Sequence, residues 1–246
     1  MALVIGNGIT IGNGITITPT ASAAIATNGS LLFNSNYLSV AGGAGTTMST
    51  GDFTWECWVY PTASTNYQAF IDSRTTPLGG GDTTGFYFGT NYNTITPMYY
   101  TNGLQLASSI NMTLNAWNHV ALTRASGTVK LWVNGASGGT RTGDTTNLSQ
   151  QRVFIGSSGL DLYLKGRMSN IRIVKGVVVY TGAFTPPTSA LTNTQSSGTN
   201  ISAITSGQTQ LLLNTTNDAN FLKDSSDNNF TVTNNGSVTS SALNPF

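Results

Sequence analysis

Apolar and polar residues alternate with a period of two along most of this chain, a pattern typical of β-strands with one buried face. The clearest case is residues 52–60. The apolar positions of this segment point to one face of the predicted strand: Phe53, Trp55, Cys57 and Val59. The intervening positions point to the other face: Thr54, Glu56, Trp58 and Tyr60. No stretch keeps the 3.6-residue apolar period of an amphipathic helix, so the predicted class is all-β.

Shorter apolar runs bounded by Gly, Asn, Asp and Ser predict the remaining strands. They cover residues 31–33, 37–40, 69–72, 85–89, 95–100, 117–124, 129–133, 152–155, 168–174, 210–213, 221–222 and 230–233. The first two runs are expected to pair as a hairpin around residues 34–36. The loop compositions fall at residues 75–84, 135–143 and 192–207. Short strands at this spacing predict an antiparallel two-sheet sandwich or jelly roll.

The N-terminal segment contains two successive copies of Ile-Gly-Asn-Gly-Ile-Thr, at residues 5–10 and 11–16. Its isoleucines alternate with small or polar residues: Ile5, Ile9, Ile11, Ile15 and Ile17. Burying them gains too little to offset the entropy lost when this backbone is fixed. We therefore expect residues 1–20 to be an arm for anchoring or self-association, ordered by a sheet edge or by other copies. A homotrimer is the first expectation because intertwined fibrous arms often trimerise, and residues 25–246 are expected to form one domain.

The content and distribution of charged residues say little about the function of the chain. Charged residues are 8% of the chain, against roughly 25% in typical soluble proteins, and the net charge is +1. This balance gives no general affinity for nucleic acids or acidic membranes. Residues 124–175 are locally basic, with a net charge of +6. The basic side chains there are Arg124, Lys130, Arg141, Arg152, Lys165, Arg167, Arg172 and Lys175. They are either solvated strand and loop charges or one face that docks on an acidic partner.

The lack of a recognisable targeting signal and the single cysteine predict synthesis in a reducing cytoplasm. Cys57 is the single cysteine, so an intrachain disulfide is excluded. The N-terminus lacks the basic region of a signal peptide. No run of about 18 apolar residues exists, so insertion in a membrane is not expected.

The sequence offers few side chains suited to acid–base catalysis. Hydrolysis of glycosidic bonds usually needs two suitably spaced carboxylates, and Glu56 is the only glutamate, accompanied by eight aspartates. We interpret Glu56 as a strand-end charge paired with an arginine or a backbone group. His119, the only histidine, is interpreted as a hydrogen-bonded strand residue, and Cys57 as a buried, inert thiol. The chain is therefore expected not to be an enzyme.

Metal and ligand sites are harder to locate. His and Cys are too few for a zinc site, and no cofactor is expected apart from possible calcium. Asp224, Asp227 and Asn228 could supply oxygen ligands to calcium, or they could simply form the turn through Asx hydrogen bonds. The candidates for stacking on a sugar are tyrosines beside Asn- and Thr-rich loops: Tyr67, Tyr92, Tyr99 and Tyr100. The alternative is that these tyrosines are half-buried strand residues.

Several segments together resemble the laminin-G-like jelly roll of the concanavalin A-like lectin and glucanase superfamily. They are residues 52–59, 117–124, 129–135, 154–156 and 166–173, in this order over roughly residues 30–180. The resemblance implies a two-sheet jelly roll. The Glu-x-Asp-x-x-Glu arrangement of the related glucanases is absent, so their hydrolytic activity is only a remote alternative. The superfamily usually opens with a Leu-Leu strand and an Asp-Ser turn; here similar pieces close the chain, which predicts that the C-terminal segment pairs beside the first strand.

Residues 179–187 and 224–231 resemble pieces of laminin-G-like structural proteins from marine and cyanobacterial tailed phages, and the N-terminal arm is similar to theirs. This resemblance implies a non-enzymatic virion structural protein: a head decoration, a head fibre or a tail-associated subunit. Its expected partners are capsid or tail proteins, and its expected location is the virion surface after synthesis in the host cytoplasm. The alternative function is a carbohydrate-binding adhesin that recognises host-surface glycans.

Overall fold

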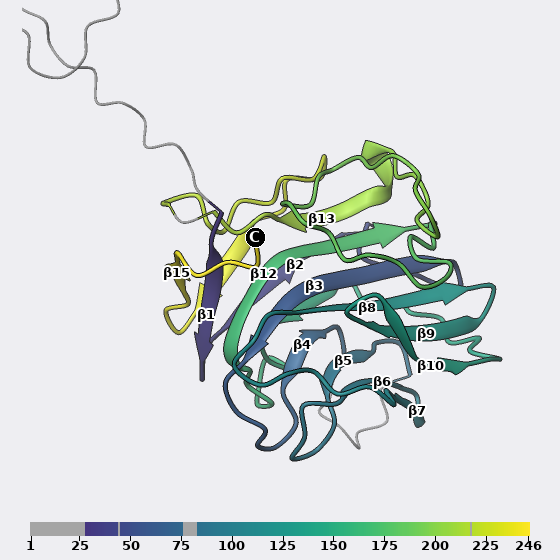
Figure 1. The fold of residues 1–246 in the computed structure, drawn as a ribbon, viewed down its shortest axis with the longest axis horizontal. Coiled ribbons are helices and arrows are strands. Elements are labelled where there is room, and N and C mark those ends of the chain that lie inside the picture. Colours follow the sequence, from purple (N-terminus) through teal and green to yellow (C-terminus); the bar gives the residue numbers. More distant parts are fainter. Residues whose placement is uncertain (1–27, 44, 76–82, 217) are drawn as a thin grey trace, which may run out of the picture.

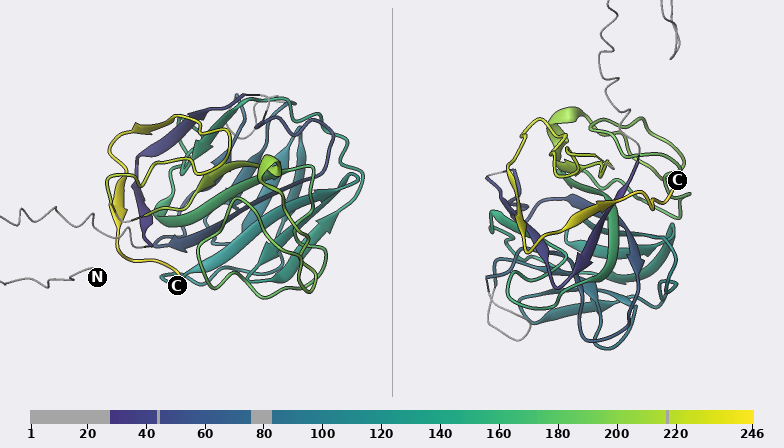
Figure 2. Two further views of the ribbon diagram at one scale, coloured as in Figure 1. Left: turned by 90° about the horizontal axis from the view of Figure 1, so that it is seen from above. Right: turned by 90° about the vertical axis from the view of Figure 1, so that its left-hand side faces the viewer.

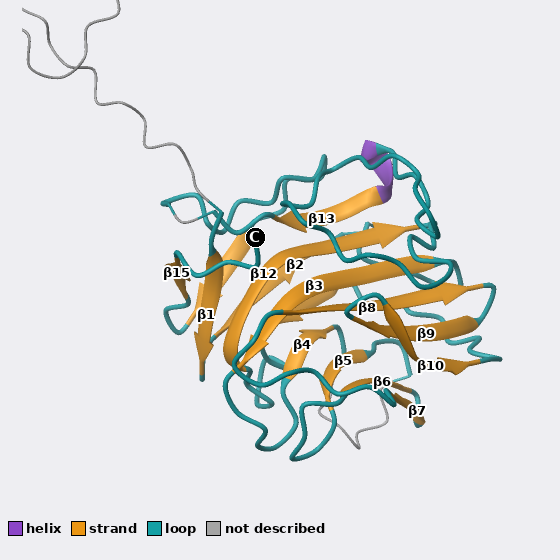
Figure 3. Cartoon of the chain, viewed as in Figure 1, coloured by secondary structure: helices purple, strands orange, loops and turns teal. Residues whose placement is uncertain are grey.

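The computed structural model describes residues 28–43, 45–75, 83–216 and 218–246, which form a sandwich of two antiparallel sheets (Figure 1). The predicted all-β fold is confirmed. Within these ranges the helical content is one short 3₁₀ turn, Ser206–Gln208, and the connections are loops (Figure 3). The predicted arm, residues 1–20 with its five isoleucines, lies outside the described residues, as do residues 76–82 of the predicted loop at 75–84.

The first sheet has the strand order β10-β9-β8-β3-β12-β1-β15, with β13 paired to β12. Its strands are β1 (Ser30–Asn34), β3 (Phe53–Pro61), β8 (Asn118–Ala125), β9 (Thr128–Val133), β10 (Ala136–Arg141), β12 (Lys165–Lys175), β13 (Thr209–Leu213) and β15 (Thr239–Ser241). The second sheet has the order β14-β2-β11-β4-β5-β6-β7. Its strands are β2 (Tyr37–Ala41), β4 (Ala69–Asp72), β5 (Tyr87–Thr90), β6 (Pro97–Thr101), β7 (Leu104–Ala107), β11 (Arg152–Ile155) and β14 (Val232–Asn235).

The main core fills the space between the two sheets, and β3 supplies one of its walls. The inward residues are those that the period-two pattern predicted: Phe53, Trp55, Cys57 and Val59. Phe86, which precedes β5, packs against both Phe53 and Trp55, with ring centroids 5.9 and 4.6 Å apart. Aromatic packing of this kind contributes much of a sandwich core.

The predicted hairpin around residues 34–36 is wrong. β1 pairs with β12 and β15 in the first sheet, whereas β2 pairs with β11 and β14 in the second. The chain crosses between the sheets at Ser35, whose φ is 61°. A short polar linker between two apolar runs suits a hairpin and a crossover equally well, and the partners that decide between them are far away in sequence.

The prediction of a loop at residues 135–143 is also wrong, because β10 pairs there with β9. The glycines that suggested a loop are required by close packing against the end of β7. A Cβ added to Gly138 would lie 2.2 Å from Ser108 Oγ, and one added to Gly139 would lie 3.2 Å from Leu106 Cδ1. The predicted strand at residues 221–222 is absent from the described structure, since these side chains pack on the core from a turn. Strands β7 and β15 were not predicted.

The C-terminal segment joins both sheets. β15 pairs with β1 through Ser30–Ser241, Leu31–Ser240 and Leu32–Thr239, and β14 pairs with β2. Figure 2 shows this segment lying against β1. The expected return of the chain to its first strand is thus observed.

Residues 176–205, which we call the strap, cross the outer face of the first sheet. A second apolar cluster lies between the strap and the sheet: Ala121, Trp132, Val174, Val179, Tyr180 and Ile204. The Thr54 hydroxyl donates to Val177 O at 3.0 Å and accepts from Val179 N at 2.8 Å. Hydrophobic contact and hydrogen bonds therefore bury the outer face of β3, which the alternating pattern alone would leave exposed.

Candidate functional site

Glu56, the residue first to be considered for catalysis, lies under the strap and is fully buried. We call Glu56, His119, Arg172 and Tyr180 the Glu56 cluster. Arg172 Nε and Nη2 lie 2.8 and 2.6 Å from Glu56 Oε1. Glu56 Oε2 accepts a hydrogen bond from the Tyr180 hydroxyl at 2.5 Å and lies 3.0 Å from His119 Nε2. Three elements of the fold, β8, β12 and the strap, thus converge on one carboxylate.

The same cluster fastens the strap. Arg172 also donates to Thr192 O at 3.1 Å and to Gln195 Oε1 at 2.8 Å, so one guanidinium joins β3 to two points of the strap. The interpretation of Glu56 as an arginine-paired charge is correct. Its placement at a strand end is wrong, because Glu56 is the fourth residue of nine-residue β3. The partners Arg172 and Tyr180 were not foreseen, although a charge inside a predicted strand is a signal that it has a partner.

Burial by itself would raise the pKa of Glu56, but the charge of Arg172 and the hydrogen bonds from His119 and Tyr180 outweigh it and lower the pKa to about 2. The carboxylate is therefore ionised at neutral pH. None of its three side-chain partners is a carboxyl group. A proton donor with this pKa, sealed from solvent, is unsuited to general acid catalysis.

His119 and Cys57 occupy structural positions. His119 is fully buried, and its backbone N–H donates to Asn134 Oδ1 at 2.9 Å. Cys57 is also fully buried, and burial raises the pKa of its thiol, which keeps it protonated and unreactive. Both residues lie where their interpretation as strand residues placed them.

The three calcium candidates each form hydrogen bonds with different residues. Asp224 is 2% exposed, and its carboxylate accepts hydrogen bonds from Leu212 N at 3.0 Å, Ser226 N at 2.9 Å and Phe230 N at 2.8 Å. Asp227 accepts from Asn193 Nδ2, and Asn228 donates to Gln210 O.

The turn alternative accounts for these bonds, and the calcium alternative stays a prediction. Asp224 takes the place of a neighbouring strand at the edge of β13. Within the described part of the chain, no three His, Cys, Asp or Glu side chains are grouped to hold a metal ion.

Two of the eight basic residues in the region 124–175 lie in the interior. Arg124 and Arg172 are fully buried. Arg124 donates to Gly51 O and Thr146 O, both at 2.9 Å, and to Ser49 O at 2.5 Å, so it holds two loops onto β8. The two alternatives, solvated charges or one docking face, therefore concern only the other six basic residues.

The four candidate tyrosines separate into two groups. Tyr99 is fully buried in the main core, and its hydroxyl donates to Asp144 Oδ2 at 2.8 Å, so its prediction as a ligand residue is wrong. Tyr100, the next residue on β6, faces outward and flanks a small apolar cluster with Tyr67. Tyr67 and Tyr92 lie together, with ring centroids 5.2 Å apart and planes inclined by 50°. Tyr92 is 55% exposed.

Two loops hold this pair, which we call the tyrosine shelf. Asn66 N donates to Asn93 Oδ1 at 2.7 Å, and Asn93 N donates to Asn66 O at 3.1 Å. Both asparagines have positive φ, 56° and 53°, which Asn tolerates better than most residues. Each tyrosine N–H is also bonded to the preceding asparagine side chain, at 2.8 Å. The shelf is thus preorganised by local hydrogen bonds at the ends of β4 and β5.

We predict that Glu56→Gln destabilises the fold and weakens its dependence on acid. The pKa of Glu56 falls from about 4.5 to about 2 on folding, so its contribution, on the order of 3 kcal/mol, is complete above pH 4.5 and is lost as pH falls toward 2. The variant also leaves Arg172 buried without its counter-charge, which costs roughly 3–5 kcal/mol. Urea denaturation at several pH values measures both effects. Asp227→Asn, on the surface, is the matched control, and equal curves for all three proteins would contradict the role of Glu56.

We predict that Asp224→Ala destabilises the protein by at least about 3 kcal/mol, because it strands several buried donors that each cost roughly 1–3 kcal/mol. Asp227→Ala should change stability little. Thermal unfolding with excess calcium and with a chelator tests the two interpretations of this turn. Equal midpoints in both conditions are expected, and a calcium-dependent gain that disappears in Asp224→Ala would support the metal site.

No described helix is long and apolar enough to cross a membrane. No curated protein matches the chain. Among solved structures, a "putative carbohydrate binding protein" from Bacteroides ovatus ATCC 8483 is similar over 87% of this chain, with 16% identity and a TM-score of 0.57. The chain spans 62% of the length of that protein.

Two further structures are more distant. The sialidase module CBM40 of Ruminococcus gnavus bound to α2,3-sialyllactose is 16% identical, with 63% of this chain and 92% of that chain covered and a TM-score of 0.49. The Limulus polyphemus SAP-like pentraxin is 14% identical, with 64% and 78% covered and a TM-score of 0.45. A family profile described as the concanavalin A-like lectin/glucanases superfamily, of laminin G type, matches residues 32–186. This match, together with the two-sheet fold, shows that the chain belongs to the concanavalin A-like lectin/glucanases superfamily.

Proposed function

We propose that this protein is a non-catalytic, carbohydrate-binding module that contacts glycans through the tyrosine shelf. The observation that carries the proposal is the exposed, preorganised pair of Tyr67 and Tyr92. Tyrosine rings offer an apolar face for a sugar ring at little entropic cost, and the polar loop groups around them suit sugar hydroxyls. The shelf combines these features at one point of the surface.

The loops beneath the shelf favour binding without rearrangement. The Thr90 N–H donates to Gln68 O at 2.9 Å, and the Gln68 N–H donates to Thr90 Oγ1 at 3.0 Å, so the roots of both loops are joined. The reciprocal bonds of Asn66 and Asn93 join their tips. A ligand that meets rings already fixed in place loses less free energy to ordering.

The Glu56 cluster supports binding over hydrolysis. A glycosidase would need Glu56, or an aspartate pair, to reach the scissile bond. Glu56 is instead enclosed by Arg172, His119, Tyr180 and the strap. The similarity to the Bacteroides ovatus protein agrees with a carbohydrate ligand as far as a shared fold allows.

We further propose that the module is displayed on a tailed-phage particle, as a head decoration, head fibre or tail-associated protein. This rests on the resemblance of residues 179–187 and 224–231 to phage structural proteins and on the repeated isoleucine arm. The expected assembly is a homotrimer attached to capsid or tail proteins at the virion surface. Several copies would convert weak single contacts with host glycans into avid adhesion.

We predict that Tyr92→Ala lowers glycan affinity about tenfold, as expected when one aromatic contact of roughly 1–1.5 kcal/mol is lost. The measurement is a glycan array with the intact oligomer, followed by titration of the best ligand. Leu243→Ala, a distant exposed apolar residue, is the matched control and should leave binding unchanged.

Two results would contradict this proposal. One is the absence of any glycan signal at high valency, and the other is an affinity that does not change in Tyr92→Ala. Incubation of the same glycans with the protein is expected to release no reducing ends. Release that disappears in Glu56→Gln would favour the hydrolase alternative.

We predict that deletion of residues 1–20 leaves the sandwich folded but converts the oligomer to a monomer, since the isoleucine repeat is expected to carry self-association. Circular dichroism measures the fold, and light scattering measures the mass. Asn7→Ser and Asn13→Ser, which keep every isoleucine, serve as matched controls. An unchanged oligomer after the deletion would contradict self-association through residues 1–20. Failure to detect the protein on purified virions with an antibody would contradict its display on a phage particle.

A further inference from the structure

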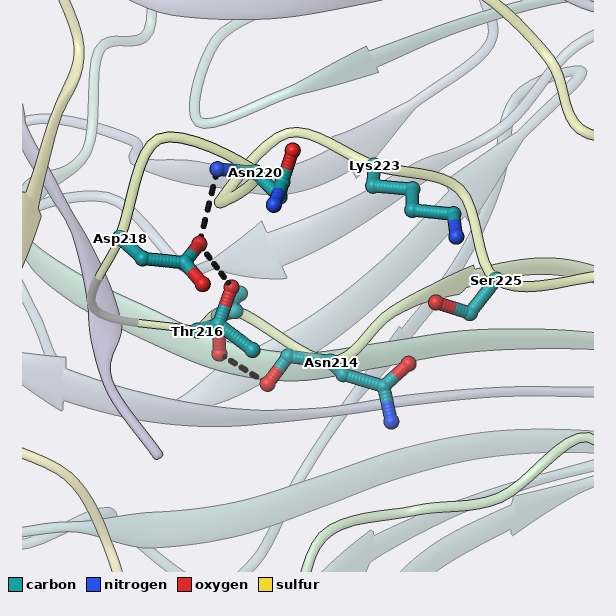
Figure 4. Close-up of a pocket in the computed structure, with 7 residues that line it drawn as sticks. Asn214, Thr216, Asp218, Asn220, Lys223 and Ser225 are labelled. Atoms are coloured by element: carbon teal, nitrogen blue, oxygen red, sulfur yellow. Dashed lines mark hydrogen bonds between the residues drawn. The ribbon is translucent and has the colours of Figure 1, made fainter. Parts of the chain in front are cut away.

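A second candidate site, a concave one, lies in the loop that follows β13. Its volume is about 180 Å³, and seven polar residues line it: Asn214, Thr215, Thr216, Asp218, Asn220, Lys223 and Ser225 (Figure 4). We call this space the loop hollow. β13 belongs to the first sheet and the shelf strands β4 and β5 to the second, and Figure 1 shows β13 above β4 and β5. The hollow therefore belongs to a different part of the surface.

Three hydrogen bonds fix the walls of the hollow to separate parts of the fold. Asn214 Nδ2 donates to Leu191 O at 2.7 Å, which ties the hollow to the strap. The buried Thr215 hydroxyl donates to Gly29 O at 3.1 Å, at the start of β1. Ser225 N donates to Leu212 O at 2.8 Å, on β13. The backbone around the hollow and the side chains of Asn214 and Thr215 are thus held in place before any ligand arrives.

The acceptor oxygens that line the hollow can accept further hydrogen bonds. Asn214 Oδ1 is buried and makes no hydrogen bond within the described structure. Such a group is costly to leave unpaired, so it calls for a ligand or an ordered water. Asp218 Oδ1 accepts from Thr216 Oγ1 and from Asn220 N, both at 2.8 Å, which aims the carboxylate across the hollow.

The donors stand on the opposite rim. Figure 4 shows the Lys223 ammonium and the Ser225 hydroxyl across the hollow from Asp218. Lys223 forms no ion pair within the described ranges. The hollow therefore presents acceptors on one side and donors on the other.

We infer that the loop hollow binds a single neutral sugar residue. Sugar hydroxyls both donate and accept hydrogen bonds, so one ring could satisfy Asn214 and Asp218 as well as Lys223 and Ser225. A carboxylate in the wall disfavours phosphate and other anions, and the ammonium disfavours cations. The volume is below the roughly 300–1,000 Å³ of pockets for drug-sized ligands, which limits the occupant to about one ring. The hollow goes beyond the proposed function, because it stands or falls independently of the shelf.

The test is an NMR titration of the full-length, isotope-labelled protein with galactose, glucose, mannose and N-acetylglucosamine in turn. At least one sugar should shift amide signals of residues 214–216 and 218–225 while leaving the loops around Tyr67 and Tyr92 unchanged. The double variant Lys223→Met, Ser225→Ala removes both donors from exposed positions and should weaken binding about tenfold or more. Lys165→Met, an exposed lysine on β12, is the matched control and should bind like the wild type.

Three outcomes would overturn the inference: no shift in the loop with any sugar, shifts that persist unchanged in the double variant, or shifts with inorganic phosphate but not with sugars. Loss of array binding in Tyr92→Ala with unchanged loop shifts supports two separate sites. Failure of the array with intact loop shifts would remove the shelf proposal and leave the hollow standing.

Discussion

The ion pair between Glu56 and Arg172 is the interaction on which the outer layer of this protein depends. A carboxylate buried at the centre of β3 is tolerable only if its charge is compensated, and the guanidinium on the adjacent strand does this at 2.6 Å. The remaining donors of Arg172 then reach the strap at Thr192 and Gln195. The ion pair that compensates the buried charge in the sheet thus also holds the strap in position.

This arrangement has a consequence for chemistry. Val179 and Tyr180 of the strap pack with Trp132 of the sheet in one apolar cluster, and the Glu56 carboxylate is fully buried. A charge that is committed to holding the fold is unavailable for proton transfer to a substrate. The proposal of recognition therefore rests on the exposed rings and polar loop groups of the described surface.

The fold was largely predictable because period two is a local signal. The alternation around Trp55 fixed both the strand and its buried face, and the Leu-rich run near Leu212 identified β13. The two wrong predictions, a hairpin at residues 34–36 and a loop at residues 135–143, depended on contacts between distant residues. β1 and β2 pair with strands of opposite sheets, and Ser108 packs against Gly138. Neither contact can be inferred from neighbouring residues.

The candidate sites divide in the same way. Tyr99 and Tyr100 are consecutive on a strand, so only one of them could face solvent, and this signal was available from the sequence. The pairing of Tyr67 with Tyr92 depends on hydrogen bonds between two loops, and the partners of Glu56 are 63 to 124 residues distant. The hollow at Asn214 unites residues from a segment whose composition is that of an ordinary loop.

The most direct test of the account is a crystal structure of the protein with an oligosaccharide selected on the array. The account predicts sugar density against Tyr67 and Tyr92, with the strap closed and Glu56 still bonded to Arg172. Density for a sugar in contact with the Glu56 carboxylate, reached by displacement of the strap, would contradict it.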